Sequence, residues 1–378
     1  KFLRAELLIR DERPAEAELL LQAACECSNE EQDHFIYDSI GIFMDYMLWD
    51  YAESWCMRLK HISPKYKGLP EIEAEIKMCT GDYDSAIDIL NGILDINSYN
   101  SQAWNMLAES YFSKGTFEEA IEACQFALAI NEDDFKAIST LADCYYHTSS
   151  FSKAHEYYEK ALMMRQDDAL YHMDAVSLFQ MGEFEQALVQ LKKAREIIED
   201  DPEKEIYVAM QLATVASKLH LFDEAMSYLK RVKSLIRDKR GLIDYEVLYG
   251  QVMLENGFAD KAREHFENAL TKCEDTDKAV LVIGIAYYEQ EHYRMAAEIL
   301  SKLTDKPDSV TANFALPYLA LCHMKLENTE LYLKYLRLAT THCTELTAQL
   351  FEELFPGVQP EDIYYYAYKN IYGCFPNI

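Results

Sequence analysis

The side chains best suited to chemistry in this sequence are Cys144 and His147, which lie three positions apart. On a helix this spacing places a thiol and an imidazole on one face, where they could act as nucleophile and base or as two metal ligands. The chain contains 10 cysteines and 10 histidines, so one such pair is expected by coincidence. The pair alone does not indicate an active site.

Other signals for catalysis are weaker. Cys322 and His323 are adjacent, and they point to different faces of a helix. The same holds for Cys25 and Cys27. There is no phosphate loop, dinucleotide fingerprint, G-x-S-x-G or H-E-x-x-H motif. Because no acid, base and nucleophile converge, we predict that the protein is not an enzyme and has no catalytic residues, metal site or cofactor.

The composition is that of a soluble, helix-rich protein. Half of the 378 residues are apolar, and no apolar run approaches the roughly 20 residues that span a bilayer. The net charge of −29 would repel nucleic-acid phosphates and the anionic face of a membrane. Residues 1–200 carry 17 basic and 38 acidic residues (net −21), against 19 and 27 (net −8) in residues 201–378. We predict a protein or peptide partner, with a basic one favoured, no nucleic-acid binding and no membrane insertion.

The cysteines are scattered and lack the paired spacing of a disulfide or zinc framework. We therefore expect a reducing compartment, the cytoplasm. No signal peptide is visible, but the chain opens at Lys1 in a helical pattern, which is consistent with removal of an upstream segment.

One alanine recurs along the chain at a nearly constant interval. The intervals are 35, 34, 34, 34, 33, 38, 37, 34 and 36 residues, in the range of stacked helical repeats. The aligned residues, the last a tyrosine in place of alanine, are Ala17, Ala52, Ala86, Ala120, Ala154, Ala187, Ala225, Ala262, Ala296 and Tyr332.

Other features keep fixed distances from that alanine. In four repeats a glycine lies five positions before it, where a helix must end and the chain must turn with φ > 0. An aromatic residue lies three positions before it in most repeats, and large, small and aromatic side chains lie further upstream at helical spacing. Each repeat is therefore predicted to be two amphipathic helices joined by a tight turn. The four glycines are Gly81, Gly115, Gly182 and Gly257.

This pattern resembles the tetratricopeptide repeat family over roughly residues 1–343, most closely at 101–134 and 135–168. The resemblance implies an all-α fold, a right-handed superhelical solenoid of about ten helix hairpins with a C-terminal helical cap. A hairpin of this size cannot bury its apolar stripe alone, so its neighbours must cover it. We predict a solenoid domain over 1–343, where longer repeats allow a change of pitch near 197–241, and capping helices over 344–378.

In such an array the first helices face the concave side. Two sets of side chains would line it. The first set, in an acidic and aromatic peptide-binding groove, is Tyr37, Asp38, Glu71, Glu75, Asn105, Glu109, Phe112, Asp143, Tyr146 and His172. The second set is apolar and consists of Val247, Leu248, Leu281, Val282, Ile285, Phe314 and Leu321.

Each set has two interpretations. The carboxylates either form a solvated helical face or converge to attract a Lys- or Arg-bearing peptide that stacks on Phe112 and Tyr146. The apolar set is either covered by the C-terminal helices or open to a hydrophobic partner or a second copy. The family's carboxylate clamp for acidic tails requires mostly basic residues where this chain has Glu71, Glu75 and Glu109, so an acidic tail is not expected.

Asp174 departs from the repeat, because it occupies the place of Leu107 and Leu141 in the neighbouring units. We interpret it as a carboxylate hydrogen-bonded to backbone or a neighbouring hydroxyl, and not as a catalytic group.

The predicted function is a non-enzymatic scaffold that binds a protein or peptide in its concave groove. One alternative is a regulatory or sensory module that binds a small ligand or signalling peptide. Another is a structural subunit of a secretion or envelope assembly. The sequence names neither the partner nor the oligomeric state.

Overall fold

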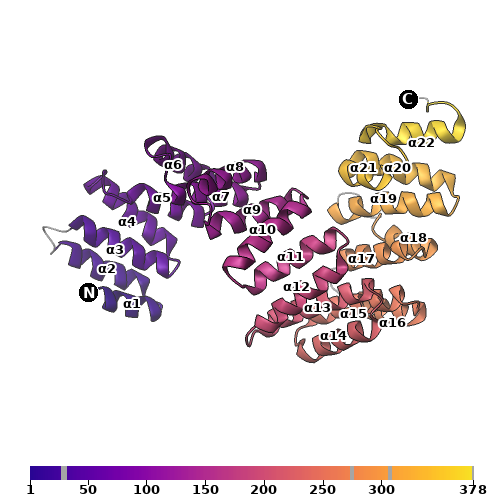
Figure 1. The fold of residues 1–378 in the computed structure, drawn as a ribbon, viewed down its shortest axis with the longest axis horizontal. Coiled ribbons are helices and arrows are strands. Elements are labelled where there is room, and N and C mark those ends of the chain that lie inside the picture. The colour runs from indigo at the N-terminus through magenta and orange to yellow at the C-terminus, as the bar shows by residue number, and fades with distance from the viewer. Residues whose placement is uncertain (27–31, 273–275, 305–308, 377–378) are drawn as a thin grey trace. The chain divides into compact units, whose positions relative to one another are not determined.

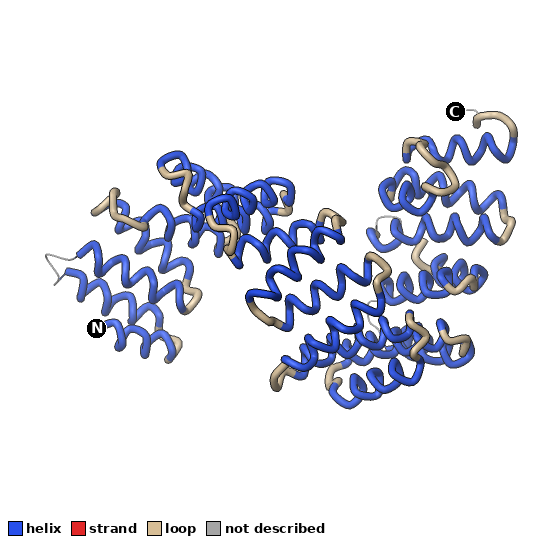
Figure 2. The backbone as a smooth tube through the Cα atoms, in the orientation of Figure 1, coloured by secondary structure: helices blue, strands red, loops and turns tan. Residues whose placement is uncertain are grey.

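The computed structural model describes residues 1–26, 32–272, 276–304 and 309–376. Within these ranges the chain forms 22 α-helices, one short 3-10 helix and no strand (Figure 1, Figure 2). Cys27 lies outside the described residues. The predicted all-α fold is confirmed.

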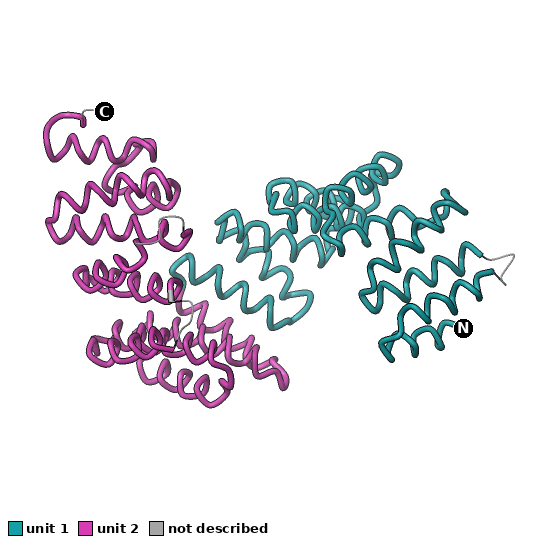
Figure 3. The backbone as a smooth tube through the Cα atoms, turned by 180° about the vertical axis from the view of Figure 1, so that it is seen from behind, with its two compact units in different colours: residues 1–183 teal, residues 184–378 magenta. Residues whose placement is uncertain are grey.

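The chain divides into two compact units, residues 1–183 and 184–378 (Figure 3). Unit 1 contains five helix hairpins followed by a single helix, and the two helices of each hairpin pack against each other. The hairpin helices are α1 (Phe2–Arg10), α2 (Pro14–Glu26), α3 (Gln32–Asp45), α4 (Trp49–Ile62), α5 (Leu69–Cys79), α6 (Tyr83–Ile96), α7 (Ser101–Lys114), α8 (Phe117–Ile130), α9 (Phe135–His147) and α10 (Phe151–Met164), and the last helix is α11 (Asp168–Gln180).

Unit 2 opens with one helix, continues with four hairpins and ends in shorter helices. Its members are α12 (Phe184–Ile197), α13 (Pro202–Lys218), α14 (Phe222–Leu235), α15 (Lys239–Glu255), α16 (Ala259–Lys272), α17 (Thr276–Glu289), α18 (Tyr293–Ser301), α19 (Val310–Lys325), α20 (Thr329–His342), α21 (Thr344–Phe351), the 3-10 helix η1 (Pro360–Asp362) and α22 (Ile363–Tyr372).

The aligned alanines lie where the helices approach most closely. All nine are 0% exposed, and Tyr332 is 6% exposed. Twelve positions earlier, on the first helix, the residue is also small in most repeats. At Gly250 an added Cβ would lie 2.4 Å from the ring of Phe266 on α16, which explains why no larger residue fits there.

Ten turns in the described chain have one residue in the left-handed backbone conformation, five positions before the aligned residue. Four of them are the predicted glycines, with φ of 80 to 84°. The other six carry side chains and have φ of 55 to 60° although this conformation costs such residues about 1–2 kcal/mol. They are Glu12, Met47, Ser149, His220, Glu291 and Glu327. Packing of the two helices must therefore hold these turns closed.

The C-terminal helices pack on the last hairpin of unit 2. α21 contacts α19 and α20, and α22 contacts α20. Phe351 and Ile363 are buried in the same core as Leu336. The boundaries predicted for the solenoid and the cap, and the change of pitch near 197–241, stay predictions.

Candidate functional site

A polar pocket lies between three successive first helices of unit 1. Its volume is about 350 Å³, and α7 contacts both α5 and α9 around it. Three of the residues predicted to line the groove meet here, Glu75 from α5 and Asn105 and Glu109 from α7. The other lining residues are Met78, Ser101, Gln102, Met106, Asp134 and Lys136.

The floor of this pocket is built around Asp134, which caps the N-terminus of α9. One carboxylate oxygen accepts the backbone N–H groups of Lys136 (3.1 Å) and Ala137 (3.2 Å). The other accepts Nδ2 of Asn105 (2.8 Å) and Oγ of Ser101 (2.9 Å). Burial acts to raise the pKa of Asp134, but these hydrogen bonds outweigh it and hold the pKa below its usual value. The carboxylate therefore stays ionised and fixes the Asn105 amide.

Asn105 leaves one strong acceptor unused. Its Nδ2 must face Asp134, because the flipped amide would set oxygen against oxygen. Its Oδ1 is buried and has no hydrogen-bond partner among the described residues. Since Asn105 is only 7% exposed, this unmet acceptor carries the desolvation cost of a buried polar atom. A ligand N–H that reached the floor of the pocket would remove that cost.

The walls of the pocket are acidic. Glu109 forms an ion pair with Lys136 at 2.9 Å, and both side chains are partly exposed. Such surface pairs contribute about 0–1 kcal/mol, so a ligand cation can replace Lys136 at little cost. Glu75 is exposed. Burial is the largest cause that raises the pKa of Cys79, and the charges of Glu75 and Glu109 raise it further. Both carboxylates therefore act on the same thiol.

The acidic wall continues into aromatic side chains. Phe112 lies one turn after Glu109 on α7, with its ring centroid 5.6 Å from that of Phe117 and 5.4 Å from that of His147. Tyr146 on α9 joins the same group, 5.6 Å from His147. Phe112 and Tyr146 are both half-buried, so part of each ring is available to a ligand. The structure thus places five of the predicted residues along two neighbouring first helices and α5.

The other predicted groove residues do not line this pocket. Tyr37 packs on Tyr66, with centroids 5.0 Å apart, and its hydroxyl would lie 3.2 Å from a Cβ added at Gly68. Asp143 accepts the hydroxyl of Tyr158 at 2.5 Å, and burial raises the pKa of this carboxyl. Asp143 is thereby tied to the second helix of its own hairpin.

The remaining three stay on the surface or at its edge. Asp38 is exposed, and Glu71 and His172 are half-buried. Burial lowers the pKa of His172, which favours the neutral form of its imidazole.

In unit 2 the predicted apolar lining is mostly packed inside the unit. Val247, Leu248 and Leu321 are buried, whereas Phe314 is 43% exposed. Leu281, Val282 and Ile285 are half-buried. The first helices of this unit therefore present less free apolar surface than their composition predicts.

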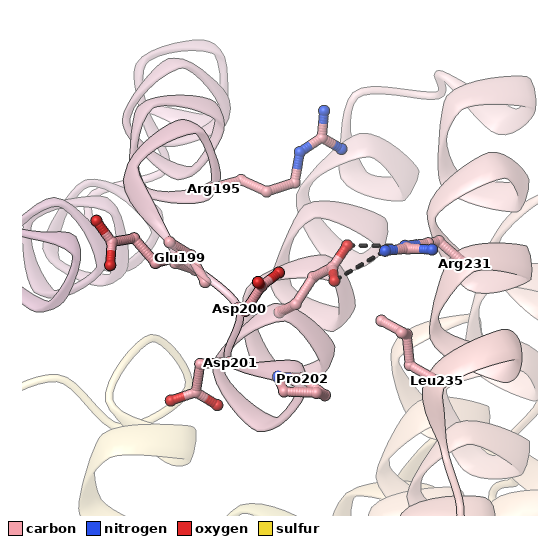
Figure 4. A pocket seen from close by; sticks show the side chains of 9 residues that line it. Arg195, Glu199, Asp200, Asp201, Pro202, Arg231 and Leu235 are labelled. Carbon is pink, nitrogen blue, oxygen red and sulfur yellow. Dashed lines mark hydrogen bonds and ion pairs between the residues drawn. The ribbon is translucent and has the colours of Figure 1, made fainter.

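Sequence reasoning missed a larger cleft in unit 2, of about 770 Å³, around the loop between α12 and α13. Glu205 on α13 binds Arg231 on α14 through both oxygens, at 2.7 and 2.9 Å. Figure 4 shows Arg195 reaching across the opening and Glu199 pointing away from Arg231. Arg195 lies 5.5 Å from the ring centroid of Tyr228. The charged run 197–205 was the available signal, and it entered the prediction only as part of the range 197–241, where longer repeats allow a change of pitch.

The residues that could have done chemistry have structural roles. Cys144 is 0% exposed, and burial raises the pKa of its thiol to about 12. His147 instead stacks on Phe117, with centroids 4.8 Å apart. Nδ1 of His155 lies 2.6 Å from Oδ1 of Asp174, so this carboxyl is hydrogen-bonded as predicted, but to an imidazole, which the prediction did not include.

Two properties of the described residues concern metal ions and membranes. No group of three or more His, Cys, Asp or Glu side chains there could hold a metal ion. None of the helices in the described ranges has the length and apolar character required to cross a membrane.

Two family models described as tetratricopeptide repeat match the chain, over residues 74–135 and 111–173. No curated protein matches it.

Three solved structures similar to this chain are distant from it in sequence. A tetratricopeptide repeat protein from Parabacteroides merdae is 14% identical, with 67% of this chain and 98% of that chain covered and a TM-score of 0.48. YrrB, described as a TPR protein with an unusual peptide-binding site, is 21% identical, with 50% and 95% covered and a TM-score of 0.42. PilW, a type IV pilus biogenesis factor, is 19% identical, with 55% and 93% covered and a TM-score of 0.45.

Proposed function

We propose that this chain is a non-enzymatic scaffold that binds a basic peptide in the pocket of unit 1. Its repeats match tetratricopeptide-repeat models over residues 74–173, and it is a tetratricopeptide-repeat protein. The peptide lies along α5, α7 and α9. The location of the chain in the cytoplasm stays a prediction.

The observation that carries this proposal is the buried Oδ1 of Asn105, which lacks a hydrogen-bond partner among the described residues in a pocket walled by Glu75 and Glu109. An acceptor on the floor and carboxylates on the walls select a ligand rich in N–H donors and positive charge. A backbone amide or a Lys ammonium can donate to the unpaired acceptor of Asn105, and Lys or Arg side chains can pair with the carboxylates.

The aromatic group beyond Glu109 adds a place for the apolar part of the same peptide. Phe112 and Tyr146 can take an aliphatic stem or an aromatic ring while the charge stays near Glu109. This arrangement favours peptides in which a basic residue is followed by an apolar one.

The test is selection of peptides from a random displayed library on the full chain, followed by affinity measurements with variants. We expect enriched peptides to carry Lys or Arg. The double variant Glu75→Gln with Glu109→Gln, and separately Asn105→Ala, should each weaken the binding of such peptides by about tenfold or more. The loss of the two carboxylates should also flatten the salt dependence.

A matched control is Asp88→Asn with Glu119→Gln, which removes two exposed carboxylates from the second helices α6 and α8. It changes the net charge by the same amount and should leave binding unchanged. If both double variants weaken binding equally, net charge alone attracts the peptide and the pocket is not the site. Unchanged binding by both pocket variants would likewise refute the proposal.

A further inference from the structure

A second surface of unit 1 combines exposed apolar side chains with negative charge, away from the pocket. Its apolar residues lie at the C-terminal ends of α6 and α8 and in the turn between α6 and α7. Ile96 is 90% exposed, Tyr99 80% and Phe126 53%. With Trp104 and Ile130 they form what we call the outer patch. Side chains this apolar are normally buried, so their grouping at one edge is informative.

The outer patch has a rigid centre. The rings of Trp104 and Phe126 stack with centroids 4.5 Å apart and planes 21° apart. Nε1 of Trp104 donates to the carbonyl of Ser98 at 2.9 Å, which ties the adjoining turn to the stack. Ile130 follows Phe126 by one helical turn and lies on the same face of α8. A partner would meet a preformed aromatic platform and lose little freedom of these side chains on binding.

The surroundings of the outer patch are acidic. Residues 83–134 contain 10 carboxylates and a single basic residue, Lys114, which pairs with Asp84 at 2.5 Å. Neither α6 nor α8 contains a lysine or arginine. Glu122 lies one turn before Phe126 on α8, and Asp95 is next to Ile96 on α6. Negative charge therefore lies one turn from the stack on α8 and next to the exposed Ile96 on α6.

This surface is separate from the pocket of the proposed function. Phe126 and Ile130 lie on the second helix α8, whereas the pocket is lined by α5, α7, α9 and the N-cap of α9. The neighbours Trp104 and Asn105 on α7 illustrate the division. Trp104 turns its ring onto α8, and Asn105 donates to Asp134 in the pocket floor.

We propose that the outer patch docks a second partner, a basic amphipathic segment whose apolar or aromatic side chain packs on the Trp104–Phe126 stack. Lys or Arg residues one helical turn away in that segment pair with Glu122 and Asp95. The charge complementarity selects the basic partner, and the stack supplies the apolar anchor. The scaffold then holds two ligands on different faces of the same hairpins.

The test uses two short synthetic peptides composed of Lys, Ala and Phe, one in amphipathic helical order and one with the same composition scrambled. Binding to the full chain is measured by fluorescence anisotropy at low and at moderate salt. The amphipathic peptide should bind at least about tenfold more tightly than the scrambled one. Phe126→Gln should abolish that preference, and Glu122→Gln should reduce the affinity and its dependence on salt.

The matched control is Met163→Gln, which removes another exposed apolar side chain of unit 1, 84% exposed on α10. It should leave the preference intact, as should the pocket variant Glu75→Gln with Glu109→Gln. Since Phe126 and Met163 are both solvent-exposed, neither change should unfold the chain, and circular dichroism checks this. Equal affinity for the two peptides, or full affinity in Phe126→Gln, would overturn the proposal. Loss of the preference in the pocket variant would place the contact that distinguishes the two peptides in the pocket, and would also overturn the proposal.

Discussion

Both units contain a buried carboxylate on a first helix that pairs with a histidine on a second helix. In unit 1, His155 on α10 contacts Asp174 on α11, at 2.6 Å. In unit 2, His265 on α16 contacts Glu246 on α15, at 2.5 Å. Each pair is separated by 19 residues in sequence, but in opposite order.

The order decides what each pair joins. His155 reaches forward from one hairpin to the first helix that follows it, so this pair joins neighbours in the stack. His265 reaches back within the hairpin α15–α16, so that pair joins the two halves of one repeat. The Asp174 side chain is 0% exposed and that of Glu246 8%. Unit 1 therefore places a fully buried carboxyl group at a stacking interface, and unit 2 places a less buried one inside a hairpin.

The largest expected effect comes from removing the histidine in unit 1. His155→Ala should lower the free energy of unfolding by about 3 kcal/mol, because it removes the imidazole that contacts a fully buried carboxylate. His265→Ala should cost less, about 1–2 kcal/mol, since Glu246 is less deeply buried than Asp174 and has Lys272 at 3.4 Å. Urea unfolding followed by circular dichroism measures both.

The double variant His155→Ala with Asp174→Leu is the control, because leucine occupies this place in the two preceding repeats. It should recover part of the loss, as apolar replacement of a buried pair often does. Equal losses for the two histidine variants would show that depth of burial does not distinguish the units.

A smaller effect is expected from the glycines, which are required for two different reasons. In unit 2, Gly250→Ala would place its Cβ 2.4 Å from Phe266, and overpacking of this kind costs about 1–3 kcal/mol. In unit 1, Gly115 has φ +84° and open space around it, so Gly115→Ala should cost only the backbone strain of about 1–2 kcal/mol.

A second substitution, followed by a measurement of stability, distinguishes the two glycine variants. Phe266→Leu should partly rescue Gly250→Ala by making room, whereas no change of side chain should rescue Gly115→Ala. A Gly250→Ala protein as stable as the parent would mean that Phe266 moves freely, and the close approach of α15 and α16 would lose its explanation.

The smallest expected effect is a change in how stability depends on pH. It should be similar in the two units. Burial lowers the pKa of His172 in unit 1 and of His323 in unit 2. The unfolded chain, with a histidine pKa of about 6.5, takes up protons at a higher pH than the folded chain. Stability is therefore complete above that value and falls as the pH drops toward the folded pKa.

His172→Gln and His323→Gln should each make the urea midpoint less sensitive to pH between about 7.5 and about 5.5. If only one variant changes that slope, the units differ in how they bury these imidazoles. If neither does, other groups govern the acid response.

Much of the fold follows from the sequence because one physical requirement repeats in every unit. The two helices can approach only where the side chain is small, so the alanines appear at the interval that the structure confirms. The turns were predictable only in part. Glu327 and Ser149 adopt the conformation predicted for Gly115, since the geometry of the hairpin imposes it whatever the residue.

The pocket was predictable to the extent that it lies on the repeating face. Glu75 and Glu109 occupy the same position in successive repeats, and Asn105 lies one helical turn before Glu109, so the helical pattern places the three together. Asp134 was missed because it lies in a turn, where its role depends on the cap it makes and not on periodicity. Tyr37 was predicted to line the groove from its position on a first helix. Its packing on Tyr66, which lies in an irregular loop, has no periodic signal in the sequence.

The left-handed turns also bear on the order in which the chain folds during synthesis. Each turn joins helices adjacent in sequence, so a hairpin closes through contacts within about one repeat, and chains rich in such local contacts fold quickly. The first hairpins can therefore assemble while the ribosome is still adding later ones. Every completed repeat then extends a surface that is already native, and the nascent chain exposes little more than one unfinished hairpin at a time.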